Sequence, residues 1–204
     1  MNEFLFLSRT NFKGGTIMEN KAIFMQGTNN MVWKDVPVPV INEEDVLVKV
    51  KAVGICGSDM HYYQHGRIGD FVVEGDFILG HEAAGEVVQI GNEVKNLKVG
   101  DRVALEPGVT CGRCEYCKTG LYNLCPDVRF FATPPYHGVF TNYVAHPEDM
   151  CFKLPDNVSY VEGALIEPLS VGLHATSRGG VKLGDTVVIF GVGCIGLSAL
   201  LASR

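Results

Sequence analysis

The sequence predicts a mostly β domain, a small barrel or sandwich, followed by the start of a parallel α/β sheet. The first part of this prediction rests on several short β-like segments, separated by glycine-bearing turns, between residues 46 and 146. The second part rests on residues 185–191, an apolar run without alternation that leads into a glycine-rich turn and a helix-like segment. We therefore expect two units, residues 18–180 and 181–204, with their boundary near residues 179–184.

The composition indicates a globular protein that acts on small molecules. With 204 residues, 47% of them hydrophobic, the chain can bury a substantial core. Its net charge of -6 and the lack of a dense Lys/Arg run give no basic surface for nucleic acid or an anionic membrane. The seven cysteines are an odd number, and four of them lie close together, which favours metal thiolates in a reducing compartment over disulfides. We therefore expect a cytoplasmic protein with neither nucleic-acid nor membrane partners.

The N-terminal segment is interpreted as an extension to the folded unit. Residues 1–17 show little regular pattern, and the apolar run at residues 4–7 is too short for a secretory signal. The sequence MENKAIFMQG, which begins at Met18, is typical of a protein start that leads into a strand. We expect residues 1–17 to be non-native and translation to begin at Met18.

The clearest strand of the first unit is predicted at residues 46–53, because its side chains alternate. Val46 and Val48 fall on one side, and Lys49 and Lys51 fall on the other, as in a half-buried strand. Further β-like runs occupy residues 82–90, 101–105 and 140–146.

A helix is predicted near the end of this unit. Ser159 and Glu162 have the spacing of a capping box ahead of the segment LIEPLSVGLHA. Pro168 lies inside that segment, and we expect it to interrupt or kink the helix.

Residues 186–203 carry no charge and approach the length of a short membrane-spanning helix. Glycines at positions 191, 193 and 196 suit a continuous lipid-facing helix poorly and instead favour a strand, a tight turn and a helix start.

Four cysteines form the strongest motif of the sequence. Cys111, Cys114, Cys117 and Cys125 have the spacing C-x2-C-x2-C-x7-C, which lets one loop surround a metal ion with four thiolates. Such a closed shell predicts a structural zinc that does no chemistry. An iron–sulfur cluster with similar spacing, or four incidental cysteines, remain as alternatives.

A second, open metal site is predicted from three separate segments. Cys56 follows the alternating strand, and His81 and Glu82 precede the next one. Glu167 lies in the apolar segment LIEPL, where an unpaired charge would be costly. Three ligands of these types leave a fourth position for water or substrate, as in a catalytic zinc site, although a lone buried cysteine or histidine is more often a packed core residue.

A nucleotide site is predicted at the glycine-rich turn. Gly191, Gly193 and Gly196 form G-x-G-x-x-G between the apolar run and the helix-like segment, and Cys194 and Ile195 lie between them. The amides of such a turn bind a dinucleotide pyrophosphate at the helix N-terminus. A glycine-rich turn without a ligand is the alternative. The acidic residue that separates NAD from NADP is expected about twenty positions further on and does not occur within the sequence.

Together these motifs resemble the zinc-containing medium-chain dehydrogenases. The resemblance covers residues 18–204 and is carried by GHEAAGEVVQIG, GDRV, the four cysteines and GVGCIG. The segments GICGSDMHYY, FFATPP and EPLSVGLHA are similar to the polyol branch of the family, typified by sorbitol and xylitol dehydrogenases. The resemblance implies a GroES-like catalytic domain followed by the first strand and helix of a Rossmann domain.

The resemblance also implies roles for individual residues. Cys56 and His81 would bind the catalytic zinc, with Glu82 and Glu167 in the same or the adjacent shell. Each carboxylate would also have a second role: Glu82 would be a catalytic group, and Glu167 would lie near the substrate. Tyr62 would lie near the substrate. Ser58 and His61 would carry the hydroxyl proton to solvent, although a turn cap and a surface ring explain these two residues equally well.

The function expected from the resemblance is oxidation of a secondary hydroxyl of a sugar alcohol to a ketone, with one catalytic zinc, one structural zinc and NAD(H). A dehydrogenase of threonine or simple alcohols, or a catalytically silent zinc-binding fragment, are the alternatives. The family suggests a homotetramer or a homodimer.

Overall fold

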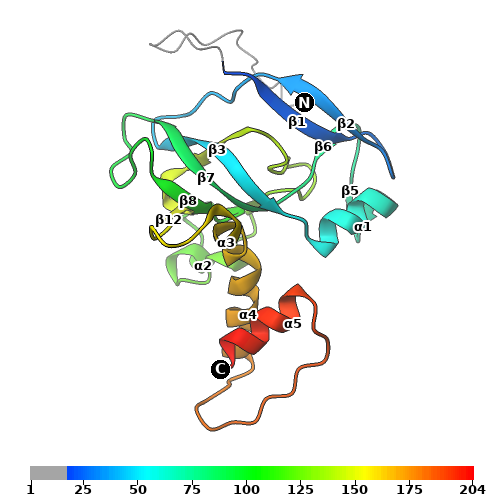
Figure 1. The fold of residues 1–204 in the computed structure, drawn as a ribbon, viewed down its shortest axis with the longest axis vertical. Coiled ribbons are helices and arrows are strands. Elements are labelled where there is room, and N and C mark those ends of the chain that lie inside the picture. Colours follow the sequence, from blue (N-terminus) through cyan, green and yellow to red (C-terminus); the bar gives the residue numbers. More distant parts are fainter. Residues whose placement is uncertain (1–17) are drawn as a thin grey trace.

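A computed structural model describes residues 18–204. The expectations about residues 1–17 and the translation start therefore lie outside the described residues. Figure 1 shows a β body from which two helices, α4 (Ile166–Arg178) and α5 (Cys194–Ala202), extend away.

The centre of the β body is a five-stranded antiparallel sheet. Its strands, in spatial order, are β11 (Tyr143–Pro147), β3 (Asp45–Gly54), β7 (Glu82–Ile90), β8 (Arg102–Leu105) and β12 (Cys151–Lys153). In β3, Lys49 and Lys51 are exposed and Val48 is buried, so the predicted alternation is confirmed from Val48 on, whereas Leu47 before it is buried as well. The same strand pairs Gly54 with Glu82 of β7, and this pair lies at the end of the sheet where the site is built.

Three smaller sheets complete the β body. The strands β2 (Met31–Val36), β1 (Asn20–Met25) and β6 (Phe77–Ile78) form one of them, and β1 begins directly after Met18 and Glu19. The other two are the pairs β4 (Arg67–Ile68) with β5 (Phe71–Val72), and β9 (Gly108–Val109) with β10 (Arg129–Phe130).

The hydrophobic core lies against the five-stranded sheet. Its largest cluster joins apolar side chains of β3, β7, β8 and β12 with two loop residues, namely Val46, Val48, Ala83, Val87, Leu97, Val103, Leu105, Val139 and Cys151. A second cluster packs Tyr62 of α1 (Gly57–His65) against Met25, Phe77 and Leu79. The core therefore fixes both the sheet end at Glu82 and the helix that follows Cys56.

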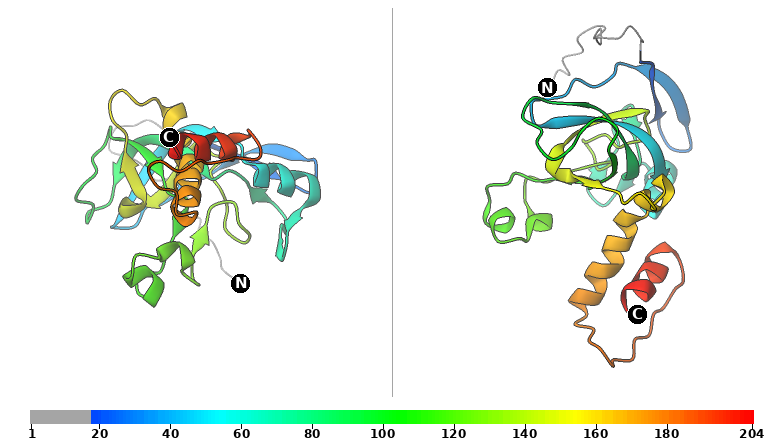
Figure 2. Two further views of the ribbon diagram at one scale, coloured as in Figure 1. Left: turned by 90° about the horizontal axis from the view of Figure 1, so that it is seen from below. Right: turned by 60° about the vertical axis from the view of Figure 1, so that its left-hand side comes forward.

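Three short helical segments shape the loops: α2 (Glu115–Lys118), the 3-10 turn Tyr122–Leu124 and the 3-10 turn Glu148–Met150. The first two belong to the cysteine lobe, which we define as residues 111–125. Figure 2 shows this lobe projecting from one side of the β body.

The predicted capping box is confirmed, and the helix is interrupted three residues before Pro168 rather than at it. The backbone N–H of Ser159 donates to Glu162 over 2.7 Å, and the backbone N–H of Glu162 donates to the Ser159 hydroxyl over 3.2 Å, which begins α3 (Tyr160–Ala164). Leu165 separates α3 from α4. Pro168 lies in the first turn of α4, where a backbone N–H has no partner within the helix, so the proline is tolerated there.

The second unit forms a helix but no strand. Residues 186–190 are irregular, which corrects the expected first strand of a Rossmann sheet. A strand requires backbone hydrogen bonds to a neighbour, and within residues 18–204 no other strand pairs with this run. The helix predicted after the glycine-rich turn is present as α5, and it packs closely on α4 because Gly172 approaches the backbone of Ser198.

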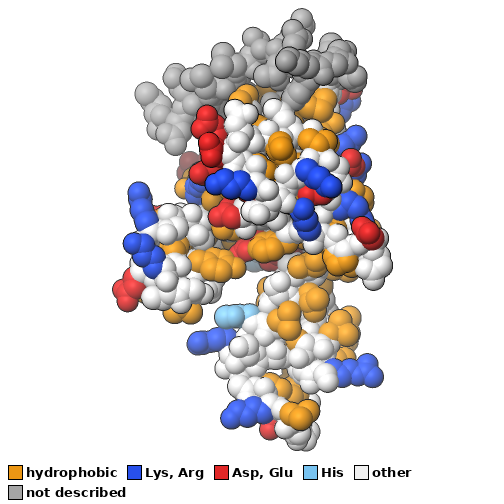
Figure 3. Space-filling model, turned by 90° about the vertical axis from the view of Figure 1, so that its left-hand side faces the viewer, with side chains coloured by type: hydrophobic (Ala, Val, Ile, Leu, Met, Phe, Trp, Pro, Cys, Tyr) orange, Lys and Arg blue, Asp and Glu red, His pale blue; other side chains and the backbone are white. Residues whose placement is uncertain are grey.

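Hydrophobic side chains are exposed around α4, α5 and the segment between them. They include Val171, Leu173, Leu183, Val188, Phe190, Leu200 and Leu201, and Figure 3 shows hydrophobic side chains on the surface of this part of the molecule. Among the helices of residues 18–204, none combines the length and apolarity that a membrane span needs.

Candidate metal and nucleotide site

The cysteine lobe brings its four sulfur atoms together around one point. The ligand atoms of Cys111, Cys114, Cys117 and Cys125 all lie within 4.8 Å of one another. The Sγ atoms of Cys114 and Cys117 are 3.4 Å apart, and those of Cys111 and Cys117 are 3.9 Å apart. A tetrahedral zinc with bonds of about 2.3 Å sets its sulfur ligands about 3.8 Å apart. The spacing therefore fits a single ion and is too small for a multi-iron cluster.

Backbone amides of the cysteine lobe favour thiolates. The N–H of Cys114 donates to Sγ of Cys111 over 3.4 Å, and the N–H of Cys117 donates to Sγ of Cys114 over 3.5 Å. The N–H groups of Arg113 and Cys114 lower the pKa of Cys111 to about 6. The N–H of Cys117 also lowers the pKa of Cys114, but burial and the neighbouring sulfur atoms raise it more, to about 11. Burial acts to raise the pKa of Cys117, but hydrogen bonds from Cys114 and Thr110 lower it more. It is therefore the Cys114 thiol that needs a cation beside it to become a thiolate.

A second group of ligand atoms lies where β3 and β7 meet α1. Cys56 is the residue before α1, and His81 and Glu82 lie at the start of β7. Their ligand atoms are all within 4.8 Å of one another, and His81 and Glu82 are buried. Among residues 18–204, only this group and the cysteine lobe gather three or more such ligands. The structure thus joins three residues that the sequence predicted as ligands of one metal.

Asp59 holds this group together, and the sequence reading missed it. It is buried, and its carboxylate accepts the backbone N–H of Cys56 over 2.9 Å and the backbone N–H of Gly80 over 2.9 Å. The same carboxylate lies 3.7 Å from Nδ1 of His81. An acidic residue three positions after the start of a helix is a capping signal, and this signal could have identified Asp59.

The electrostatics of the group favour a bound cation. Burial lowers the pKa of His81, but Asp59 and then Cys56 raise it more, so that the pKa is about 9. The negative surroundings of the imidazole therefore favour a positive charge at this point, which either a proton or a metal ion can supply. The ring of Phe130 lies beside that of His81, with centroids 5.8 Å apart.

Glu167 lies next to the group but is not one of its three ligands. It is half-buried in the first turn of α4. Burial raises its pKa, and His81 opposes this. The carboxylates of Glu82 and Asp59 raise the pKa further, so Glu167 faces the same negative surroundings.

The other predicted site residues lie on α1. Ser58 is half-buried in the first turn of the helix. Tyr62 is buried in the core, and burial raises its pKa. His61 is exposed, and its ring lies against that of His65. The structure does not place His61 among the metal-ligand atoms.

The glycine-rich turn has three different environments for its three glycines. Gly191 has φ +104°, a left-handed conformation that glycine adopts without strain. A Cβ on Gly196 would lie 2.1 Å from the carbonyl oxygen of Gly191, so only glycine allows the helix to pack on the turn. Gly193 precedes α5, and a Cβ on it would meet nothing within 4 Å. The turn therefore leaves open space at the helix N-terminus, where a pyrophosphate would bind.

The open metal group and the glycine-rich turn line the same hollow of about 550 Å³. On one side lie Cys56 and Glu82, with their neighbours Ile55 and Gly57. On the other side lie residues 189–191 and 193–196, which include all five residues predicted to bind the cofactor. A ligand in this hollow can therefore contact both elements.

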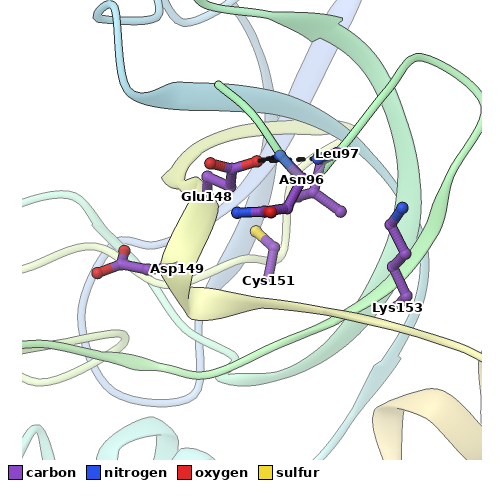
Figure 4. Close-up of a pocket in the computed structure, with 6 residues that line it drawn as sticks. All are labelled: Asn96, Leu97, Glu148, Asp149, Cys151 and Lys153. Carbon is purple, nitrogen blue, oxygen red and sulfur yellow. Dashed lines mark hydrogen bonds between the residues drawn. The ribbon is translucent and has the colours of Figure 1, made fainter. Parts of the chain in front are cut away.

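A separate hollow of about 430 Å³ lies at the other end of the five-stranded sheet (Figure 4). Its Glu148 carboxylate already accepts the backbone N–H groups of Asn96 and Leu97. Burial raises the pKa of the Cys151 thiol far above its usual range, which leaves the thiol unreactive at neutral pH. These partners are structural, and the hollow gathers no set of metal ligands.

Comparison with known proteins decides the family. The alcohol dehydrogenase GroES-like domain matches residues 42–156, more than half of the chain. The chain belongs to the GroES-like alcohol dehydrogenases. The predicted β domain is therefore the GroES-like domain of this family, and the resemblance to zinc-containing medium-chain dehydrogenases is confirmed.

Within the GroES-like alcohol dehydrogenases, the chain is similar to sorbitol dehydrogenases. It is 56% identical to sorbitol dehydrogenase of Bacillus subtilis, across 93% of this chain and 54% of the relative. It is 53% identical to sorbitol dehydrogenase of Arabidopsis thaliana, across 91% of this chain and 51% of the relative. The chain thus spans about half the length of the curated relatives it matches.

Solved structures of the family share the fold. An Escherichia coli oxidoreductase/dehydrogenase of unknown specificity is 47% identical, with a TM-score of 0.87 over 91% of this chain and 54% of that chain. An alcohol dehydrogenase of Escherichia coli, solved in complex with NADH, is 32% identical, with a TM-score of 0.80 over 88% of this chain and 51% of that chain. Residues 186–190 are irregular in this chain. The family assignment does not depend on them, because the family match covers residues 42–156.

Proposed function

We propose that this chain carries the metal-binding part of a zinc- and NAD-dependent dehydrogenase that oxidises a secondary hydroxyl of a sugar alcohol to a ketone. The observation that supports it most is the shared hollow, in which Cys56 and Glu82 of the open metal group face the glycine-rich turn. Hydride transfer needs the alcohol carbon and the nicotinamide in contact, so a metal group and a nucleotide turn must open into one space.

The donor sets of the two metal groups suit different tasks. The cysteine lobe supplies four thiolates and leaves no coordination position open, which fits a structural zinc. Cys56, His81 and Glu82 supply three ligands and leave one position, which fits a catalytic zinc. Glu167 is close enough to interact electrostatically with His81 and Glu82, and we assign it as a further carboxylate that can bind the zinc or contact the substrate. When bound, zinc acts as a Lewis acid that lowers the pKa of a substrate hydroxyl.

The residues of this chain then orient ligands and move a proton. The Asp59 carboxylate lies 3.7 Å from Nδ1 of His81, and in the proposed site it would leave Nε2 to bind the metal. Ser58 takes the substrate proton, and the exposed His61 delivers it to solvent. Tyr62 is fixed in the core beside this path and supports the substrate side of α1.

The cofactor is assigned to the turn that precedes α5. The open space at Gly193 and the amides of Cys194 and Ile195 face the hollow, and the helix N-terminus favours the negative pyrophosphate. NAD is proposed in preference to NADP from the resemblance to the polyol branch.

The proposed substrate, location and oligomeric state have separate grounds. Similarity to sorbitol dehydrogenases supports a polyol of the sorbitol, iditol or xylitol type as the substrate. A cytoplasmic location fits seven free thiols, and a homodimer or homotetramer is proposed for the complete enzyme.

A chimera tests this proposal directly. Residues 18–204 replace the matching half of Bacillus subtilis sorbitol dehydrogenase, to which the chain is 56% identical. We expect NADH formation with sorbitol or xylitol, and a loss of at least about a thousandfold in kcat for Cys56→Ser, because the open site loses a ligand.

The chimera is compared with a control variant and is also assayed with threonine and simple alcohols. The control is Cys151→Ser, since this buried cysteine lies away from the metal groups and keeps the cysteine count equal. Faster NADH formation from threonine or from a simple alcohol than from any polyol would show that the substrate assignment is wrong. A folded, zinc-loaded chimera without any turnover would instead support a silent zinc-binding chain.

A further inference from the structure

Two exposed histidines lie side by side on α1. His61 and His65 are four residues apart, about one helical turn, so their side chains share a face of the helix. Their ring centroids are 4.6 Å apart, and the ring planes are inclined at 58°. Both residues are exposed, so a metal ion can reach them from solvent.

We propose that His61 and His65 form a bidentate surface site for a divalent transition-metal cation, separate from the two cysteine-containing groups. Imidazole nitrogen is a preferred ligand of Cu²⁺, Ni²⁺ and Zn²⁺, and Cu²⁺ binds most tightly in this series. Two cis imidazoles and water satisfy the coordination of such an ion.

The observed ring separation fits chelation. With metal–nitrogen bonds of about 2.0–2.1 Å, each ring centroid lies about 3.2 Å from the ion. Angles of about 90–110° at the ion then place the two centroids about 4.5–5.2 Å apart. The separation of 4.6 Å lies within this range, so binding requires rotation of the two rings but no movement of the helix.

The helix is held at both ends, which keeps the pair together. At its start, Asp59 accepts the backbone N–H of Cys56 over 2.9 Å. At its end, Gly66 adopts a left-handed conformation, and its N–H donates to the carbonyl oxygen of Tyr62 over 2.7 Å. Tyr62 itself is buried. The loss of backbone entropy on binding is therefore small.

The other histidines provide a matched control. The chain has six histidines, of which His81 and His146 are buried and His137 is half-buried. His174 is exposed on α4, but Ser170 and Arg178 stand four residues before and after it, so it has no second imidazole on its face.

Retention on immobilised Cu²⁺ tests the site, with the zinc-loaded chain free of any affinity tag. The measured quantity is the imidazole concentration that elutes the protein. His61→Gln and His65→Gln should each lower it about tenfold, and the double variant should lose no more than either single variant, because one ion needs both rings. His174→Gln should change it little.

The zinc content of every variant, measured in parallel, reports whether the cysteine groups and the fold are intact. Retention that survives His65→Gln in a fully zinc-loaded protein would overturn the proposal. Losses that simply add in the double variant would overturn it as well, since they would show two independent histidines.

Discussion

Gly54 gives the Glu82 carboxylate its place in the open site. The two residues are paired across β3 and β7. A Cβ on Gly54 would lie 2.0 Å from Oε2 of Glu82, which no real contact allows. The missing side chain therefore lets the carboxylate lie over the strand beside Cys56 and His81, within the spacing of a metal site.

Substitution of Gly54 should weaken this metal site alone. In Gly54→Ala the new methyl group displaces the carboxylate, and we expect zinc affinity of the open group to fall about 10–100-fold, the usual effect of disturbing the support of a ligand. Competition with a chromophoric chelator measures the affinity. Zinc held by the cysteine lobe serves as an internal control for folding.

Gly57→Ala is the matched variant, because a Cβ at that position meets nothing within 4 Å. It should leave both zinc affinities unchanged. Equal affinities in the Gly54 and Gly57 variants would contradict this account of Glu82.

His146 joins two strands of the sheet through a buried hydrogen bond. It lies on β11, and its Nε2 is 2.8 Å from the carbonyl oxygen of Glu106, just after β8. The ring is fully buried, with Phe131 beside it. Burial lowers the pKa of His146 to about 4, although the Glu106 carbonyl opposes the shift.

This histidine should make the fold sensitive to mild acid. The unfolded chain takes up a proton below its ordinary pKa of about 6.5, whereas the native ring stays neutral down to a pKa of about 4. The contribution of the neutral, buried His146 ring to the free energy of unfolding is therefore complete above about pH 6.5 and is lost as the pH falls from about 6.5 to about 4. Between pH 7.5 and pH 5 the loss is about 2 kcal/mol.

Urea unfolding at these two pH values measures the effect. His146→Gln keeps a donor for Glu106 and should show a free energy of unfolding that falls about 2 kcal/mol less over this interval. His174→Gln changes an exposed ring and should fall as the parent does. Identical pH dependence in the parent and His146→Gln would show that His146 does not carry this linkage.

The longer elements of the fold could be predicted from the sequence because their periodicity is local. β3 and β7 follow the predicted runs to within one residue. β11 begins later than predicted, because Thr141 instead bridges to Ala22 of β1. The two-residue strands such as β4 and β9 carry no periodicity and could not be found. The run at 186–190 had a strand pattern, but a pattern cannot provide the neighbouring strand.

The candidate site was predictable to different degrees. The cysteine lobe follows from spacing alone, since one loop holds all its ligands. Cys56 and His81 were predicted from motifs, and only the pairing of β3 with β7 brings them together. Gly54 acts through its close approach to the distant Glu82 and left no spacing that could reveal it, whereas Asp59 stands three residues after Cys56, a capping spacing that could have been recognised.

In the molecule as a whole, the open metal group and the glycine-rich turn line one hollow, the cysteine lobe is a separate loop, and α4 and α5 extend away from the β body (Figure 1). The β core fixes Glu82 and α1. Helix α4 carries Glu167 in its first turn and packs against α5, the helix that follows the glycine-rich turn. The chain spans about half the length of the curated relatives it matches. The ligand residues of both metal groups lie within it, so these groups can be tested on it directly.

We propose that the chain holds one closed and one open zinc site. Elemental analysis of the purified chain measures it most directly. We predict two zinc ions per chain without visible absorbance, one in Cys56→Ser, and one in the double variant Cys111→Ser/Cys114→Ser. A single zinc that Cys56→Ser leaves in place, or iron with its visible absorbance, would contradict the claim.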